Sequence, residues 1–207
     1  MRTKLLLLAT LISIFICTCE KGDNGTLGGE QSVMGQVGEE VYSFDISGVE
    51  QATATVTSLE DGISTFSGSA VITHPAILNI VSDIPDFEVN GNNVTVTGLK
   101  FKVTTEGIES KNPSYPGIIV KYASNVGDTY SAGSGVTRKV ISKSVDDDYP
   151  YLYLNIKVIK VEESPSIIPG VKKLVYIANH RFGIVGLELT VDDNTTTSFI
   201  FGGSSEN

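Results

Sequence analysis

The chain has 207 residues and a formal net charge of −9 at pH 7, with 15 Lys and Arg residues against 24 Asp and Glu residues. No basic cluster offsets this charge, which would repel phosphate backbones, so we expect no nucleic-acid partner. Cys17 and Cys19 are the only cysteines. The rest of the chain therefore holds no disulfide, thiol catalyst or thiolate metal site.

The first 18 residues have the layout of a secretory signal peptide. Arg2 and Lys4 form a cationic start, residues 5–16 are largely apolar, and the chain turns polar soon afterwards. The apolar run is too short for a transmembrane helix, which needs about 20 such residues. We therefore predict that residues 1–18 are removed after export. Because Arg2 and Lys4 leave with them, 13 basic and 24 acidic residues remain, a net charge of −11.

The sequence Ile16-Cys17-Thr18-Cys19 resembles the lipobox of bacterial lipoproteins. In that motif an aliphatic residue lies three positions before the acceptor cysteine, and a small residue lies directly before it. Cys19 is the predicted acceptor; Cys17 is the rival, but the bulky Ile16 precedes it. The resemblance implies cleavage before Cys19 and attachment of several acyl chains, which together give stable membrane anchoring. An ordinary cleaved signal with an incidental cysteine is the alternative.

A single domain is predicted to follow a tether. Residues 20–38 are rich in glycine and show no apolar periodicity, so we interpret residues 19–38 as a lipidated flexible tether. Residues 39–203 are enough for one domain with a substantial core.

Most of the domain shows the two-residue periodicity of β-strands, in short runs separated by turn residues. The hairpin signal is clearest at Glu60-Asp61-Gly62, since glycine adopts positive φ readily. The predicted strands are residues 40–46, 52–59, 63–72, 94–105, 117–123, 136–144, 151–163, 172–179, 183–191 and 195–201.

Two local irregularities are predicted. Residues 75–83 form the one helix, with Thr73 as its cap and Pro85 beyond its end. In the strand at 94–105 the apolar residues change phase around Gly98, which indicates a β-bulge. The pattern as a whole predicts a mainly β domain: a curved antiparallel sheet, either a half-barrel or a two-layer sandwich, with one short helix.

No catalytic residue, cofactor or metal site is predicted. His74 and His180 have no partner at metal-ligand spacing and no nucleophile-elbow serine, so we interpret both as structural or solvent-facing. The acidic turns at 146–148 and 192–194 lack the spacing of a calcium loop. Solvated turns are the favoured interpretation of both, and calcium binding is the alternative.

Three tyrosines are candidate recognition residues. Tyr115 lies between two prolines in a predicted exposed loop at 106–116, and Tyr151 and Tyr153 share one face of the strand predicted at 151–163. The alternative for each is packing beneath a neighbouring loop or sheet.

Four segments of the second half, at 126–130, 138–141, 175–178 and 182–185, resemble uncharacterised lipoproteins of Bacteroidota-type bacteria. In that group such strands often form a curved antiparallel sheet similar to the half-barrel of the lipoprotein carriers LolA and LolB. The resemblance implies an apolar concave face that can hold acyl chains. The chain departs from the carriers in having one short helix where they have more helical cover.

The sequence thus predicts a lipid-anchored cell-envelope module that binds a partner or has a structural role, without catalytic activity. The expected location is the outer membrane, on its periplasmic face or at the cell surface, and the partner is an unidentified protein or lipid. One alternative is a carrier of lipid or another apolar ligand, which needs a contiguous apolar cavity. A second is a fimbrial or adhesin-like subunit with an exchangeable edge strand, and an envelope hydrolase is the least favoured.

Overall fold

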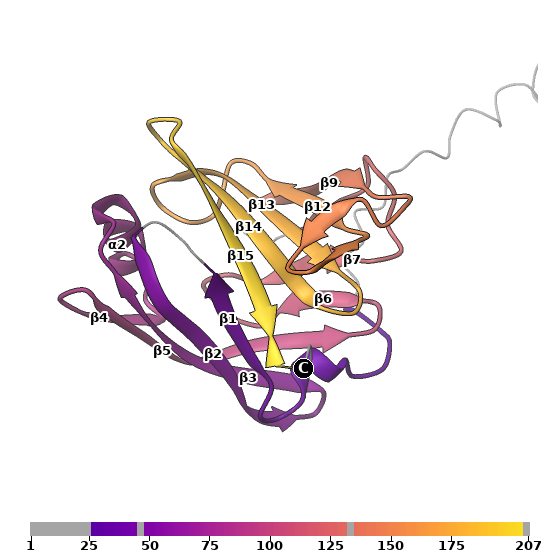
Figure 1. Cartoon of the computed structure of the whole chain (residues 1–207), viewed down its shortest axis with the longest axis horizontal. Coiled ribbons are helices and arrows are strands. Elements are labelled where there is room, and N and C mark those ends of the chain that lie inside the picture. The colour runs from indigo at the N-terminus through magenta and orange to yellow at the C-terminus, as the bar shows by residue number, and fades with distance from the viewer. Residues whose placement is uncertain (1–25, 45–47, 132–134, 205–207) are drawn as a thin grey trace, which may run out of the picture.

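The computed structural model describes residues 26–44, 48–131 and 135–204. Antiparallel strands dominate it, with one α-helix and one 3-10 turn (Figure 1). The elements in chain order are η1 (Val33–Gly35), β1 (Glu40–Phe44), β2 (Val49–Glu60), β3 (Ile63–Ile72), α2 (Pro75–Ser82), β4 (Phe87–Asn90), β5 (Asn93–Thr104), β6 (Gly107–Ser110), β7 (Gly117–Lys121), β8 (Thr129–Ser131), β9 (Thr137–Lys143), β10 (Tyr149–Tyr151), β11 (Leu154–Ile156), β12 (Ile159–Glu163), β13 (Val171–Asn179), β14 (Gly183–Val191) and β15 (Thr196–Gly203).

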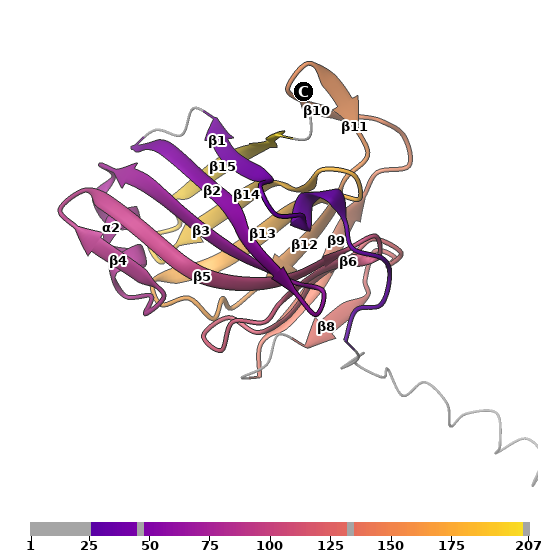
Figure 2. The same cartoon turned by 90° about the horizontal axis from the view of Figure 1, so that it is seen from below.

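One sheet holds 13 of the 15 described strands, in the order β7-β6-β5-β3-β2-β1-β15-β14-β13-β12-β9-β8, with β4 added beside β5. The sheet curves back on itself, so that β1 to β5 form one wall and β12 to β15 the wall opposite (Figure 2). The predicted mainly β fold with a curved antiparallel sheet is confirmed. The open choice between half-barrel and sandwich is decided in favour of a single, nearly closed barrel-like sheet.

The two ends of the sheet meet along a seam that side chains bridge. Strand β7 contacts β8, β12 and β13. Across this seam the Tyr130 hydroxyl of β8 lies 3.4 Å from the backbone nitrogen of Lys121. From β9, Arg138 Nη1 donates to the carbonyl oxygens of Pro116 and Ile118, at 3.3 and 3.0 Å. Side-chain donors thus take the place that ladder hydrogen bonds occupy in a fully closed barrel.

The main hydrophobic core lies inside the curved sheet. Leu174, Tyr176 and Ala178 alternate along β13 and belong to this inner cluster. The residues between them are buried as well, because the β10–β11 hairpin covers the outer face of the wall; Ile177 packs there with Tyr151. Coverage on both faces explains the nearly continuous apolar run of β13, since an antiparallel strand exposed on one face alternates with polar residues.

The predicted tether ends earlier than expected. Leu27 and Met34 are buried, at 2% and 5% exposure, and the Ser32 amide donates to the Val103 carbonyl oxygen. Residues 27–38, which we assigned to the tether, therefore pack against the barrel. Two buried side chains seven positions apart produce no periodicity that a short window detects. Residues 19–25 lie outside the described residues.

The predicted helix and bulge are both present. Helix α2 buries Ile77 and Ile80, but its N-cap is His74, which makes no side-chain capping hydrogen bond, and not Thr73. In β5, Gly98 has φ +80°, and the pairing with β3 shifts register around it. None of the helices in the described ranges is long and apolar enough to span a membrane.

The strand predicted at 151–163 is in fact three strands, β10, β11 and β12. Tyr151 pairs with Leu154, so Leu152 and Tyr153 form a hairpin turn, with Leu152 at φ +49°. The apparent apolar alternation that begins at Leu152 does not describe a buried face, because Leu152 and Leu154 are exposed. Similarly, the loop predicted at 106–116 contains the buried strand β6.

Candidate functional site

A cavity of about 600 Å³ lies between the two walls of the barrel. Aliphatic and aromatic side chains of β5, β13, β14 and β15 form its sides: Leu99, Phe101, Leu174, Tyr176, Leu187 and Phe201. The rest of the lining comes from three connecting segments, at 83–87, 112–115 and 167–169. This volume falls within the usual range of small-molecule sites, roughly 300–1,000 Å³.

A second cavity of about 230 Å³ adjoins the first and extends toward Met34 and Ile108. The two cavities share Leu99, Phe101 and Phe201 as lining residues. These three side chains form the boundary between the cavities. The interior is therefore a partly empty apolar chamber and not a fully packed core, which natural proteins normally fill densely.

A buried ion pair lies beside the larger cavity. Arg138 Nε and Glu163 Oε2 are 2.7 Å apart, and both side chains are fully buried. The two residues face each other in the β9–β12 ladder. Glu163 also accepts hydrogen bonds from the Ser166 hydroxyl and the Ile167 amide, each at 2.9 Å. The carboxylate is thus well satisfied, as a buried charge must be.

Two tyrosine rings of the cavity wall flank the Arg138 guanidinium. Its Cζ atom lies 4.9 Å from the centroid of the Tyr115 ring and 5.7 Å from that of Tyr176. The Tyr115 hydroxyl donates to Glu163 Oε2 at 3.3 Å. Burial, followed by the negative charge of Glu163, raises the pKa of Tyr115 well above its ordinary value. Tyr115 therefore remains a neutral hydrogen-bond donor at any physiological pH.

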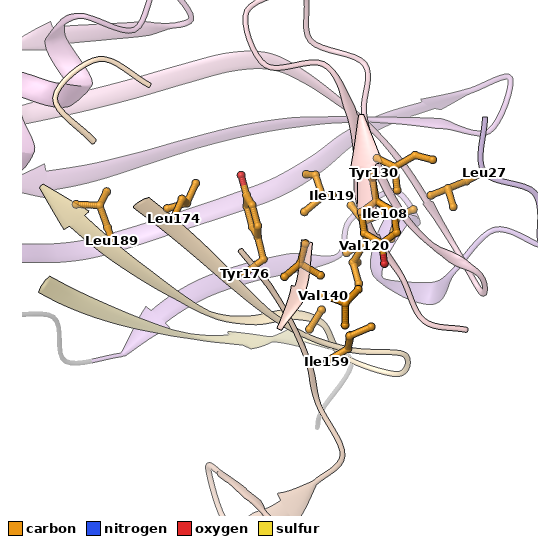
Figure 3. Close-up of a cluster of buried hydrophobic side chains, with 14 of the residues drawn as sticks. Leu27, Ile108, Ile119, Val120, Tyr130, Val140, Ile159, Leu174, Tyr176 and Leu189 are labelled. Atoms are coloured by element: carbon orange, nitrogen blue, oxygen red, sulfur yellow. The ribbon is translucent and has the colours of Figure 1, made fainter. Parts of the chain in front are cut away.

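The Tyr176 hydroxyl has no such partner. Its oxygen is buried and makes no hydrogen bond to any described residue, and the same holds for Arg138 Nη2. Tyr176 is 5% exposed, and its side chain extends from β13 toward the opposite wall of the barrel (Figure 3). Tyr176 also lines the larger cavity, but its hydroxyl oxygen is fully buried, so its ring and not its hydroxyl faces the chamber.

The polar part of the cavity lining carries negative charge. Asp83 and Asp86 lie in the segment that follows α2. Asp86 accepts a hydrogen bond from the hydroxyl of Ser114, another lining residue, and Asp83 is exposed. An anionic molecule that approaches this side of the chamber meets like charge.

The three predicted recognition tyrosines do not form one site. Tyr115 lines the larger cavity. Tyr151 is 3% exposed, with its hydroxyl donating to the Phe201 carbonyl oxygen at 2.8 Å and its ring beside Phe182. Tyr153 is fully exposed in the β10–β11 turn. Tyr151 and Tyr153 thus do not share a strand face, because the predicted strand turns between them.

The histidines and acidic turns lie away from the chamber lining. His74 precedes α2, with its buried Nδ1 unpaired among the described residues, and the His180 ring lies 6.5 Å from the Tyr122 ring. Asp146, Asp147 and Asp148 are exposed. Asp193 accepts a hydrogen bond from the Thr195 amide, which holds the pKa of its carboxyl below the usual value. Within the described ranges, no three His, Cys, Asp or Glu side chains gather as a metal site would require.

Comparisons with protein families, with curated proteins and with solved structures gave no match for this chain. The resemblance to envelope lipoproteins and to LolA and LolB therefore stays a prediction, and the fold and cavity are interpreted on their own geometry.

Sequence reasoning did not single out Arg138, Glu163 or Tyr176 as site residues. A usable signal was present, because Glu163 shares its strand face with Ile159 and Val161, and Arg138 shares its face with Val140. A charged residue in the apolar phase of a strand indicates either an edge or a buried ion pair. Choosing between them requires knowing which strands become neighbours.

Proposed function

We propose that this protein is a lipid-anchored envelope protein that binds an apolar ligand inside its barrel, without chemical change to the ligand. The observation that carries the proposal is the pair of adjoining apolar cavities, of about 600 and 230 Å³. An empty apolar void of this size leaves its lining without contacts and lowers stability, and a bound ligand would restore those contacts.

The choice of a ligand-binding role over a purely structural one follows from the lining. The walls are aliphatic and aromatic, with a few polar groups, which is the usual composition of a small-molecule site. The carrier alternative needed a contiguous apolar space, and the cavity of about 600 Å³ supports it. The fimbrial alternative needed a free edge strand, whereas β7 and β8 at the two ends of the strand order contact each other, and β4, which pairs only with β5, is four residues long.

Filling the cavity is expected to abolish ligand binding. Leu187→Trp places an indole in the larger cavity and should weaken binding of the fluorescent dye N-phenyl-1-naphthylamine at least about tenfold, equivalent to about 1.4 kcal/mol. The protein for this titration is residues 19–207 with Cys19→Ser, which keeps every described residue and needs no detergent. Melting followed by circular dichroism checks that the variant is folded.

Ile200→Trp is the matched control, since Ile200 is 43% exposed and its neighbour Phe201 faces the cavities. It should bind the dye as the unsubstituted chain does. Failure of the unsubstituted chain to take up dye, or equal affinity in both variants, would contradict a ligand chamber. Native mass spectrometry of protein purified from bacteria supplies an independent readout, in which we expect a retained apolar molecule.

Cys19→Ala is expected to release the protein from the membrane fraction, because the thioether that anchors it can no longer form. Cys17→Ala is the control and should leave the protein in the membrane. Cell fractionation measures both, together with metabolic labelling by a clickable fatty acid. An unlabelled native protein would exclude the proposed anchor without bearing on the cavity.

A further inference from the structure

The larger cavity meets solvent at two of the connecting segments that line it. Its exposed lining residues are Asp83, Pro85 and Pro169, whereas the lining residues on the strands are buried or half-buried. The two segments lie close together, because a Cβ atom added at Gly170 would be 3.4 Å from Ile80 Cγ1 of α2. A molecule that enters the chamber from solvent therefore passes the segment at 83–87, which carries two carboxylates.

The charges at this entrance are not neutralised. Neither Asp83 nor Asp86 forms an ion pair within the described part of the chain. Asp86 accepts a hydrogen bond from the Ser114 hydroxyl, which leaves its charge in place. None of the residues that line the cavity is Lys, Arg or His. The entrance thus has a negative potential, which the net charge of the whole chain reinforces.

The cation nearest to the chamber is not available to a ligand. The Arg138 side chain is fully buried and paired with Glu163 at 2.7 Å, and its guanidinium lies against the rings of Tyr115 and Tyr176. It is therefore already neutralised, and these two rings belong to the cavity lining while Arg138 does not. A carboxylate or phosphate inside the chamber would have no counter-charge, and burying an unpaired charge is very costly.

We propose that the ligand is an amphiphile with a positively charged end, such as an alkylammonium. This inference rests on the proposed ligand-binding function and specifies the chemical class of ligand. The apolar part occupies the chamber beside Leu174 and Leu187, and the cationic end stays at the entrance near Asp83 and Asp86. The apolar walls supply the binding, and the two carboxylates select the charge of the end group. Because that end remains in contact with water, it avoids most of the cost of desolvation.

Three probes with the same alkyl chain test the inference: octylamine, octanol and octanoate, which at pH 7.5 are cationic, neutral and anionic. Each is used to displace N-phenyl-1-naphthylamine from residues 19–207 with Cys19→Ser. We expect octylamine to bind about five- to tenfold more tightly than octanoate, the sum of a few weak interactions between partly exposed charges. The ratio should fall toward one in about 1 M NaCl, where the Debye length is about 3 Å.

Equal affinity for octylamine and octanoate, or tighter binding of octanoate, would overturn the inference. Displacement by octanol would still show that the chamber binds an apolar molecule. Failure of all three probes to displace the dye would instead refute the proposed function itself.

Asp83→Asn combined with Asp86→Asn should reduce the preference for octylamine over octanoate to about twofold or less. Asparagine keeps an oxygen that can accept from Ser114, so the segment retains its hydrogen bond. Asp146→Asn combined with Asp148→Asn is the matched control, because it removes the same charge from an exposed turn outside the lining, and it should keep the preference. A preference that persists in the entrance variant, or that falls equally in both, would refute the assignment to Asp83 and Asp86.

Discussion

Glu163→Ala is expected to lower the free energy of unfolding by about 3–5 kcal/mol, because it leaves Arg138 charged and buried without a counter-ion. The side chains of both residues are fully buried, at 2.7 Å from each other. Arg138 also holds the carbonyl oxygens of Pro116 and Ile118 across the seam. Movement of Arg138 toward water would therefore open the seam as well as break the ion pair.

Urea unfolding followed by circular dichroism measures this loss, since the chain has no tryptophan to report by fluorescence. The control is Glu162→Ala on the same strand. Glu162 is partly exposed, with its carboxylate 3.9 Å from Lys173 Nζ, and a surface pair of this kind contributes about 1 kcal/mol or less. Similar losses in the two variants would show that the buried pair does not hold the barrel together.

Gly107→Ala is expected to destabilise the protein by about 3 kcal/mol through a steric clash between strands. A Cβ atom at this position would lie 2.0 Å from the Val120 carbonyl oxygen of β7. The obstacle is backbone in a paired strand, so it cannot rotate away as a side chain could. Relief of the clash would move β7, whose Ile118 carbonyl oxygen accepts from Arg138, and would weaken the seam from its other side.

Gly62→Ala separates the clash from the ordinary cost of replacing glycine. Gly62 lies in the β2–β3 turn at φ +74°, and an added Cβ would meet no atom within 4 Å. Only the left-handed backbone conformation is penalised there, by about 1 kcal/mol. Thermal and urea unfolding compare the two variants. If Gly107→Ala were as mild as Gly62→Ala, β7 would have to shift freely, and the seam would be looser than its contacts indicate.

Local pattern was a reliable guide where the cause was local. The turn at Gly62, the bulge at Gly98 and helix α2 all follow from backbone preferences within a few residues, and all three predictions are confirmed. The failures have two causes: contacts with a distant segment, and a turn whose residues carry no turn signal. Leu27 and Met34 are held by contacts with strands far along the chain, and the hairpin turn at Leu152 interrupts a convincing strand alternation.

The candidate site was largely beyond sequence reasoning. The position of Tyr115 between two prolines predicts a recognition residue in an exposed loop, whereas in the structure Tyr115 lines the larger cavity. Arg138 and Glu163 are 25 residues apart in sequence. Each lies in the apolar phase of its strand, but neither strand pattern identifies the other residue as its partner. Only the structure shows that the Tyr176 hydroxyl is buried and has no hydrogen-bond partner among the described residues.

The sequence by itself determined a mainly β domain, because alternation, turn residues and the bulge glycine are encoded within short windows. It also supplied the predicted export signal and lipid anchor, which lie outside the described residues. Tertiary structure alone decided that the sheet closes on itself, that Arg138 bridges the closure and that an apolar chamber remains inside. The physical reason is that sheet closure and cavity volume depend on which side chains contact each other across the barrel. Those contacts join residues that are far apart in the sequence.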